Sequence, residues 1–240
     1  LAYGYYVGNN NSYLDEWYVV PSSRMIEPFL LALDEEGVWY KGKEYTNNGS
    51  FKAIEDLLKL RAGSVQSQNE ATYSIKQMKS CMYHSNVFVL QTHGQKDGIQ
   101  LDTMQSFMFM EDIAHLDLSE MKLAVLLTCY NGQGFNAANV TNNDPQNFME
   151  QMLCCGAETV IAFNDPIYIW DANPFVIELF RCMLEGMTVQ EALNDIVDRA
   201  SSGIYPDLAE MLDLLAVCEV GGNGNLNLFD YLDSMEVLPS

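Results

Sequence analysis

Residues 87–94 read VFVLQTHG, and residues 122–129 read KLAVLLTC. Each stretch contains an almost wholly apolar run, which is the pattern of a strand buried on both faces of a parallel sheet. Residues 159–163 form a third run of this kind. The first two runs deliver His93 and Cys129 at their carboxyl ends, and parallel strands place those ends at one edge of the sheet. These runs therefore indicate both a fold class and a place for a site.

Segments with helical periodicity separate the strands. Apolar residues spaced three or four apart predict helices at residues 25–33, 51–58, 71–82, 145–155, 174–184 and 189–200. Thr188 and Glu191 form a capping-box signature at the start of the last helix. Further short strands are predicted at residues 3–7 and 38–40 and in the tail from residue 221 to 240. The repeated order predicts an α/β fold with a mainly parallel sheet flanked by helices on both faces. No linker is visible, so residues 1–240 are expected to form one domain.

Composition narrows the class of partner. The 240 residues carry 12 basic and 33 acidic side chains, a net charge of −21, which opposes binding to nucleic acid or to an anionic membrane and favours basic partners. No apolar run approaches the roughly 18 residues that a membrane span requires. A soluble protein is expected, either cytoplasmic or secreted after loss of an N-terminal signal.

The six cysteines differ in their setting. No C-x-x-C pair and no Cys/His spacing suited to a tetrahedral zinc site occurs, so neither a metal nor another cofactor is expected. Cys154 and Cys155 fall in an apolar helical segment, where structural thiols are common. Cys129 alone follows a buried strand directly.

His93 and Cys129 form a candidate catalytic pair. If their strands are parallel neighbours about 4.8 Å apart, the imidazole can take the proton of the thiol and later give a proton to a leaving amine. Gly94 can present its backbone N–H without a side chain in the way, and with the N–H of Cys129 it would form an oxyanion hole. His84 and His115 lack both a preceding buried strand and a following glycine, so surface or helix-end positions are expected for them.

The two strand-end blocks resemble the signatures of the caspase-like (clan CD) cysteine peptidases, a group containing caspases, gingipains, clostripain, separase and CHAT-domain proteases. Residues 8–13, 98–102 and 191–193 extend this likeness and are most similar in pattern to bacterial members of the CHAT, clostripain and gingipain types. Thr128 precedes the cysteine, so the Gln-Ala-Cys signature of true caspases is absent.

The resemblance implies a caspase-hemoglobinase-like fold and a cysteine endopeptidase that uses a His93–Cys129 dyad without a cofactor. Protein or peptide substrates are expected, and a need for calcium, for self-cleavage or for an inhibitory or activating partner stays open. In this group an acidic pocket accepts Arg or Lys before the cleaved bond. Asp165 and Asp171 follow the third buried strand and are the candidates, which favours cleavage after a basic residue. The alternatives are a noncatalytic caspase-like binding or scaffold module and a flavodoxin-like signalling domain.

Overall fold

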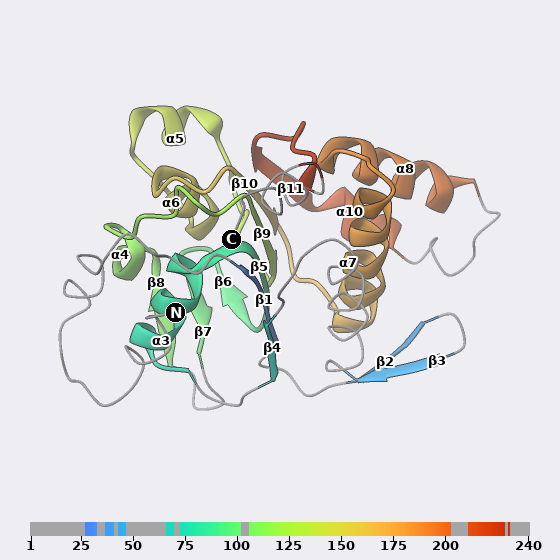
Figure 1. Cartoon of the computed structure of the whole chain (residues 1–240), viewed down its shortest axis with the longest axis horizontal. Coiled ribbons are helices and arrows are strands. Elements are labelled where there is room, and N and C mark those ends of the chain that lie inside the picture. Colours follow the sequence, from blue (N-terminus) through green and yellow to red (C-terminus); the bar gives the residue numbers. More distant parts are fainter. Residues whose placement is uncertain are drawn as a thin grey trace, which may run out of the picture.

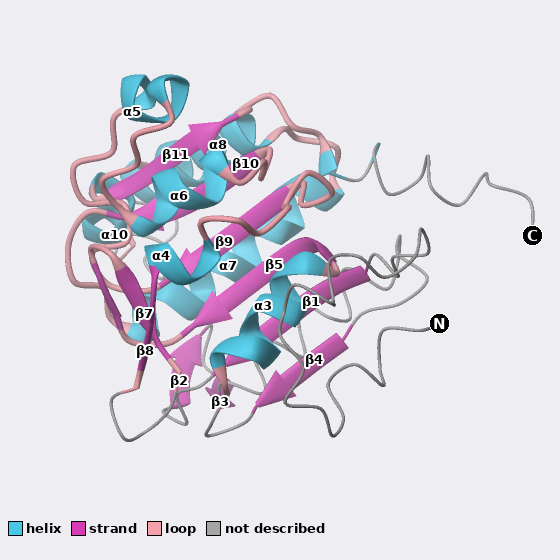
Figure 2. Cartoon of the chain, turned by 90° about the vertical axis from the view of Figure 1, so that its left-hand side faces the viewer, coloured by secondary structure: helices cyan, strands magenta, loops and turns pink. Residues whose placement is uncertain are grey.

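A six-stranded sheet forms the centre of the computed structural model, which describes residues 27–32, 37–40, 43–46, 66–69, 73–101, 106–202, 211–228 and 230. The strands of this sheet are β1 (Glu27–Ala32), β4 (Gln66–Asn69), β5 (Ser85–Gln91), β9 (Leu123–Leu127), β10 (Thr159–Phe163) and β11 (Cys218–Gly222). Their order across the sheet is β11-β10-β9-β5-β1-β4, and every neighbouring pair is parallel except β10 with β11. Figure 2 shows the strands side by side.

Helices cover both faces of the sheet, as Figure 1 shows. The described helices are α3 (Ile75–Tyr83), α4 (Met110–Ile113), α5 (Ala137–Asn142), α6 (Phe148–Cys154), α7 (Ile169–Leu184), α8 (Val189–Ser201) and α10 (Leu212–Ala216). Alternate residues of β5 enter different cores, because Val87 and Val89 pack with α7, α8 and α10 whereas Phe88 and Leu90 pack with α3, α4 and α6. The predicted fold class is confirmed.

Smaller sheets lie beside the main one. β2 (Gly37–Tyr40) pairs antiparallel with β3 (Lys43–Thr46), which confirms the strand predicted at residues 38–40. A three-stranded sheet contains β6 (Gly94–Gln95), β7 (Gly98–Gln100) and β8 (Phe107–Phe109). The β6–β7 hairpin begins directly after His93 and therefore lies at the edge where the site is expected.

The helix predicted at residues 25–33 is wrong, because Glu27–Ala32 forms β1. A short apolar run fits either period, and here parallel pairing with both β4 and β5 decides in favour of a strand. Pro28 is accommodated because the register shifts between Glu27 and Phe29, and a proline without an N–H is tolerated at such an irregularity. The segments predicted at residues 3–7 and 51–58 lie outside the described residues.

The other predicted elements differ mainly in their ends. The helix predicted at 174–184 begins earlier, at Ile169, because Pro174 sits inside α7 and does not open it. Thr188 caps α8 with Glu191 in a complete capping box, as the sequence predicts. Among the described residues the last strand is β11, at Cys218–Gly222. Leu226 and Leu228, in the tail where a strand is predicted, are buried outside any strand, and residues 229 and 231–240 lie outside the described residues.

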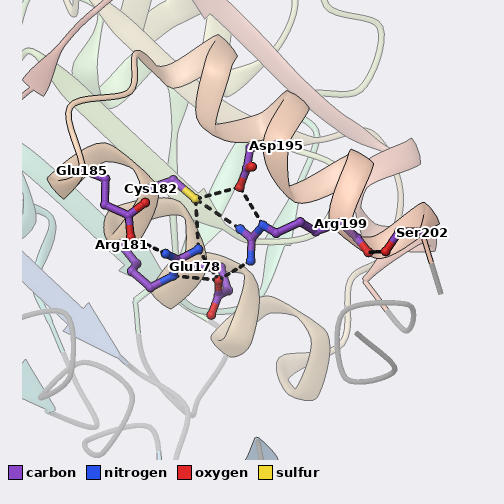
Figure 3. A network of polar contacts seen from close by, with 7 residues as sticks. All are labelled: Glu178, Arg181, Cys182, Glu185, Asp195, Arg199 and Ser202. Atoms are coloured by element: carbon purple, nitrogen blue, oxygen red, sulfur yellow. Dashed lines mark hydrogen bonds and ion pairs between the residues drawn. The ribbon is translucent and has the colours of Figure 1, made fainter. Parts of the chain in front are cut away.

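A charged network joins α7 to α8, as seen in Figure 3. Glu178 on α7 is only 1% exposed, and its carboxylate lies 3.0 Å from both Arg181 and Arg199. Arg199, on α8, also contacts Asp195 at 2.7 Å. A buried carboxylate is costly unless it is paired, so the two guanidinium groups allow Glu178 to be buried between the helices.

Replacing Arg199 with methionine is expected to lower the free energy of unfolding by roughly 3 kcal/mol, because the buried carboxylate loses its link to α8. Arg181→Met is the matched control and should cost about 1 kcal/mol, since Arg181 is more exposed and Arg199 still pairs with Glu178. Urea denaturation followed by circular dichroism measures both values. Equal losses in the two variants would contradict a dominant role for Arg199.

Candidate active site

The register of β5 and β9 brings the two candidate residues to equivalent positions. These strands are parallel neighbours in which Gln91 pairs with Leu127, and the N–H of Thr92 donates to the carbonyl of Leu127 at 3.4 Å. His93 and Cys129 each stand two residues beyond this last pair. Neighbouring strands lie about 4.8 Å apart, so the two backbones end side by side.

Cys129 is half-buried and His93 is exposed at this edge. The thiol of Cys129 lies 3.9 Å from the carbonyl oxygen of Ile167, in a geometry that suits a weak S–H donor. Ile167 belongs to the connection between β10 and α7. The thiol is thus bordered by that connection, while the imidazole follows the neighbouring strand.

Burial raises the pKa of four other cysteine thiols. Burial raises the pKa of the thiols of Cys154 and Cys155. Burial also raises the pKa of Cys182 to about 11, against the opposing effect of Arg181 and Arg199, and raises that of Cys218 to about 12. Because the thiolate is the reactive form, these four side chains stay largely unreactive at neutral pH.

Gly94 makes a close backbone approach to the end of β9. A Cβ at this position would lie 2.7 Å from the carbonyl oxygen of Cys129 and 2.8 Å from the Cβ of Thr128. Only glycine fits at that separation without a shift of backbone atoms. The sequence suggested Gly94 for its exposed N–H, whereas the structure adds a steric reason that depends on the neighbouring strand.

The chain bends sharply after Cys129. Tyr130 has a φ of 65°, a left-handed conformation that is rare for a bulky residue and is found where the surroundings enforce it. Gly132 then donates its N–H to the carbonyl of Phe163 at 3.0 Å, which ties the bend to the end of β10. The bend turns the chain away from the strand direction as soon as Cys129 has been placed.

Asn131, inside this bend, is fully buried and was not singled out by the sequence. Its amide Nδ2 donates to the carbonyls of Gln95 at 2.5 Å and Gly98 at 3.0 Å, both in the β6–β7 hairpin. Its Oδ1 accepts a hydrogen bond from the hydroxyl of Thr128. An asparagine two residues after a cysteine is an ordinary turn residue in sequence, so no local signal marks it.

A second polar side chain holds the segment that follows the bend. Glu150 on α6 is fully buried, and its carboxylate accepts hydrogen bonds from the N–H groups of Asn136 and Gln146, each at 2.7 Å. The side-chain amide of Asn139 donates to the same carboxylate. The segment that carries α5 is therefore fastened to α6.

The two candidate specificity residues occupy different places. Asp165 is exposed in the connection between β10 and α7, two residues before Ile167, whose carbonyl lies beside the Cys129 thiol. Asp171 is half-buried in the first turn of α7. Asp165 thus lies in the short segment that borders the thiol, whereas Asp171 lies in the helix that follows this segment.

The described residues contain no group of three or more His, Cys, Asp or Glu side chains that could hold a metal ion. None of the helices among them is long and apolar enough to cross a membrane.

Comparison with known proteins gives a structural likeness and no match at the level of sequence. No protein-family model and no curated protein matches the chain. Among solved structures, the Arg-specific cysteine proteinase gingipain R matches with a TM-score of 0.62 and 15% identity, over 85% of this chain and 48% of that one. The complex of the pro- and mature domains of RgpB from Porphyromonas gingivalis matches with a TM-score of 0.61 and 13% identity, over the same shares.

The fold is similar to that of the matched half of gingipain R. At this identity the likeness concerns the fold, which is the caspase-like arrangement predicted from the strand-end blocks. The chain spans about half the length of the gingipain chains that it matches.

Gly94→Ala is expected to lower the free energy of unfolding by about 1–3 kcal/mol, the usual cost of overpacking, because the new methyl group meets backbone atoms of the neighbouring strand end. Gly224→Ala is the matched control, since the nearest atom to its Cβ lies 3.6 Å away, and it should change stability by less than about 0.5 kcal/mol. Thermal and urea unfolding measure the stability of both variants and of the wild type. Wild-type stability in Gly94→Ala would mean that the hairpin and the strand end are less closely packed than described.

Proposed function

We propose that the chain is a cysteine endopeptidase that hydrolyses peptide bonds through a dyad of His93 and Cys129. The observation that supports this most strongly is the parallel pairing of β5 with β9, whose last pair, Gln91 with Leu127, lies two residues before both His93 and Cys129 at the carboxyl edge of the sheet. The gingipain fold agrees with that reaction class.

The reaction proceeds in two halves. His93 takes the proton of the Cys129 thiol, the sulfur attacks the peptide carbonyl carbon, and the carbonyl electron pair moves onto oxygen. When the tetrahedral intermediate collapses, the C–N bond breaks and the imidazolium gives its proton to the departing amine. Water then attacks the thioester while His93 takes a proton from it, the C–S bond breaks as the carboxylic acid product leaves, and the imidazolium returns its proton to the sulfur of Cys129.

The developing oxyanion is held by backbone donors. The N–H groups of Gly94 and Cys129 are assigned this role, because Gly94 approaches the backbone of Cys129 closely and carries no side chain. Preorganised donors of this kind lower the barrier because the charge they stabilise develops in the transition state.

Cleavage after a basic residue is the proposed specificity. Asp165 is the first candidate to receive the positive side chain, because its segment borders the thiol, and Asp171 is the second. The net charge of −21 favours the approach of basic peptides. Gingipain R is described as Arg-specific, which agrees with this preference.

Fluorogenic peptides ending in Arg, Lys, Asp or Leu test the activity. Cleavage by the wild type should fall by about a thousandfold or more in Cys129→Ala, because the covalent route is lost. Cys154→Ala, on α6, is the matched control and should retain activity, since burial raises the pKa of that thiol. At neutral pH iodoacetamide should label Cys129 before Cys182 or Cys218.

The opposite results separate the alternatives. Cleavage that persists in Cys129→Ala would remove the dyad from the mechanism. No cleavage of any peptide, together with an unreactive Cys129, would instead indicate a noncatalytic caspase-like module.

Asp165→Asn tests the specificity pocket. The kcat/KM for Arg and Lys peptides should fall by roughly tenfold to a hundredfold, the equivalent of one charge-assisted hydrogen bond of about 1.5–3 kcal/mol, while that for Leu peptides changes little. Asp198→Asn removes the same charge from an exposed position on α8 and is the matched control. A selective loss in Asp171→Asn alone would move the pocket to the start of α7, and cleavage after Asp would overturn the basic preference.

A further inference from the structure

The bend after Cys129 and the hairpin after His93 are joined by one buried side chain. Asn131 donates from Nδ2 to the carbonyl oxygens of Gln95 and Gly98, at 2.5 and 3.0 Å. These two carbonyls belong to β6 and β7, whose first residue, Gly94, follows His93 directly. The amide therefore spans from the nucleophile's loop to the histidine's loop.

The other end of the same amide is fastened to the strand that carries the nucleophile. The Thr128 hydroxyl, directly before Cys129, donates to Asn131 Oδ1 and is itself fully buried. The backbone carbonyl of Asn131 accepts the N–H of Met149 from α6 at 3.3 Å. The side-chain amide thus donates both of its hydrogens to the β6–β7 hairpin and accepts with its oxygen from Thr128 at the end of β9. These bonds fix its orientation.

Parallel pairing alone does not extend to the reacting groups. The last pair of β5 with β9 is Gln91 with Leu127, two residues before the dyad. Beyond it, Thr92 holds the hairpin through its hydroxyl, which donates to the carbonyl of Gln100 at 3.0 Å. Asn131 supplies the corresponding connection from the β9 side, at the point where the left-handed Tyr130 takes the chain out of the strand.

We infer that Asn131 is a positioning residue for the dyad: it holds the loop after Cys129 against the β6–β7 hairpin and so sets the distance of His93 and the Gly94 N–H from the thiol. This role rests on the proposed peptidase function. Asn131 contacts none of the reacting atoms, and its effect acts through the backbone segments that it joins. Displacements of about 1 Å at a reacting centre are enough to cost roughly a hundredfold in rate.

The test compares two buried asparagines. Asn131→Asp keeps the shape of the side chain but replaces both donors with an oxygen that faces the carbonyls of Gln95 and Gly98. Asn147→Ala is the matched control, because Asn147 is equally buried, caps α6 and donates to Gln133, but makes none of the bonds to the hairpin. Steady-state cleavage of the best peptide substrate and thermal unfolding are measured for both variants and the wild type.

Asn131→Asp should lose about a hundredfold in kcat with KM changed by less than about threefold, because the reacting groups are misplaced while the substrate still binds. Asn147→Ala should lower the midpoint of thermal unfolding and leave kcat within about threefold. Thr128→Val removes the hydroxyl donor and should reduce kcat. Thr128→Ser keeps the donor and should retain a kcat close to that of the wild type. If Asn131→Asp does not fold, the comparison of kcat between Thr128→Val and Thr128→Ser tests the inference.

The outcomes also separate this inference from the proposed function. An active wild type whose kcat is unchanged in Asn131→Asp, or reduced no more than in Asn147→Ala, overturns the positioning role and leaves the peptidase intact. A raised KM with an unchanged kcat overturns it as well. If the wild type shows no cleavage, or if its cleavage persists without Cys129, the proposed function is overturned. The positioning role, which rests on that function, is then overturned as well.

Discussion

The parallel pairing of β5 with β9 is the interaction on which the rest of the structure depends. Both strands lie in the interior of the sheet, and every described residue of their apolar runs is 2% exposed or less. Their register determines which residues emerge opposite each other at the carboxyl edge. The helices on either side bury these strands and therefore hold the register, because a slip of one residue would exchange the side chains between the two cores.

The packing around this pair differs between the two faces. On one side, α7 and α8 meet across a mostly apolar core, and the buried carboxylate of Glu178 pairs with guanidinium groups from both helices. On the other side, α6 places a second buried carboxylate, Glu150, which accepts hydrogen bonds from the N–H groups of Asn136 and Gln146. The first arrangement joins helices, and the second anchors a loop segment close to the candidate site.

The sequence predicted three of the six strands of the central sheet, β5, β9 and β10, because each contains a short apolar run. Val87–Leu90 and Thr159–Phe163 are short, continuous and bounded by polar residues, so the strand interpretation was well determined. The helix predicted at residues 25–33 is wrong because a short apolar run fits both the helical and the strand spacing of apolar residues. Only the pairing partners of the segment, which the sequence does not show, decide between the two. Asn131 and the steric role of Gly94 could not be predicted, because each depends on contact between segments more than thirty residues apart.

The central place of β5 and β9 ties the candidate site to the two inner strands of the sheet. Amide hydrogens in strands that are buried and paired on both sides exchange with solvent mainly when the whole domain opens. The segments that carry His93 and Cys129 continue directly from these two strands, so fraying at the outer edges of the sheet, at β4 or β11, leaves the strands that precede both residues paired. The strands that precede the two candidate residues consequently separate only when the centre of the sheet unfolds.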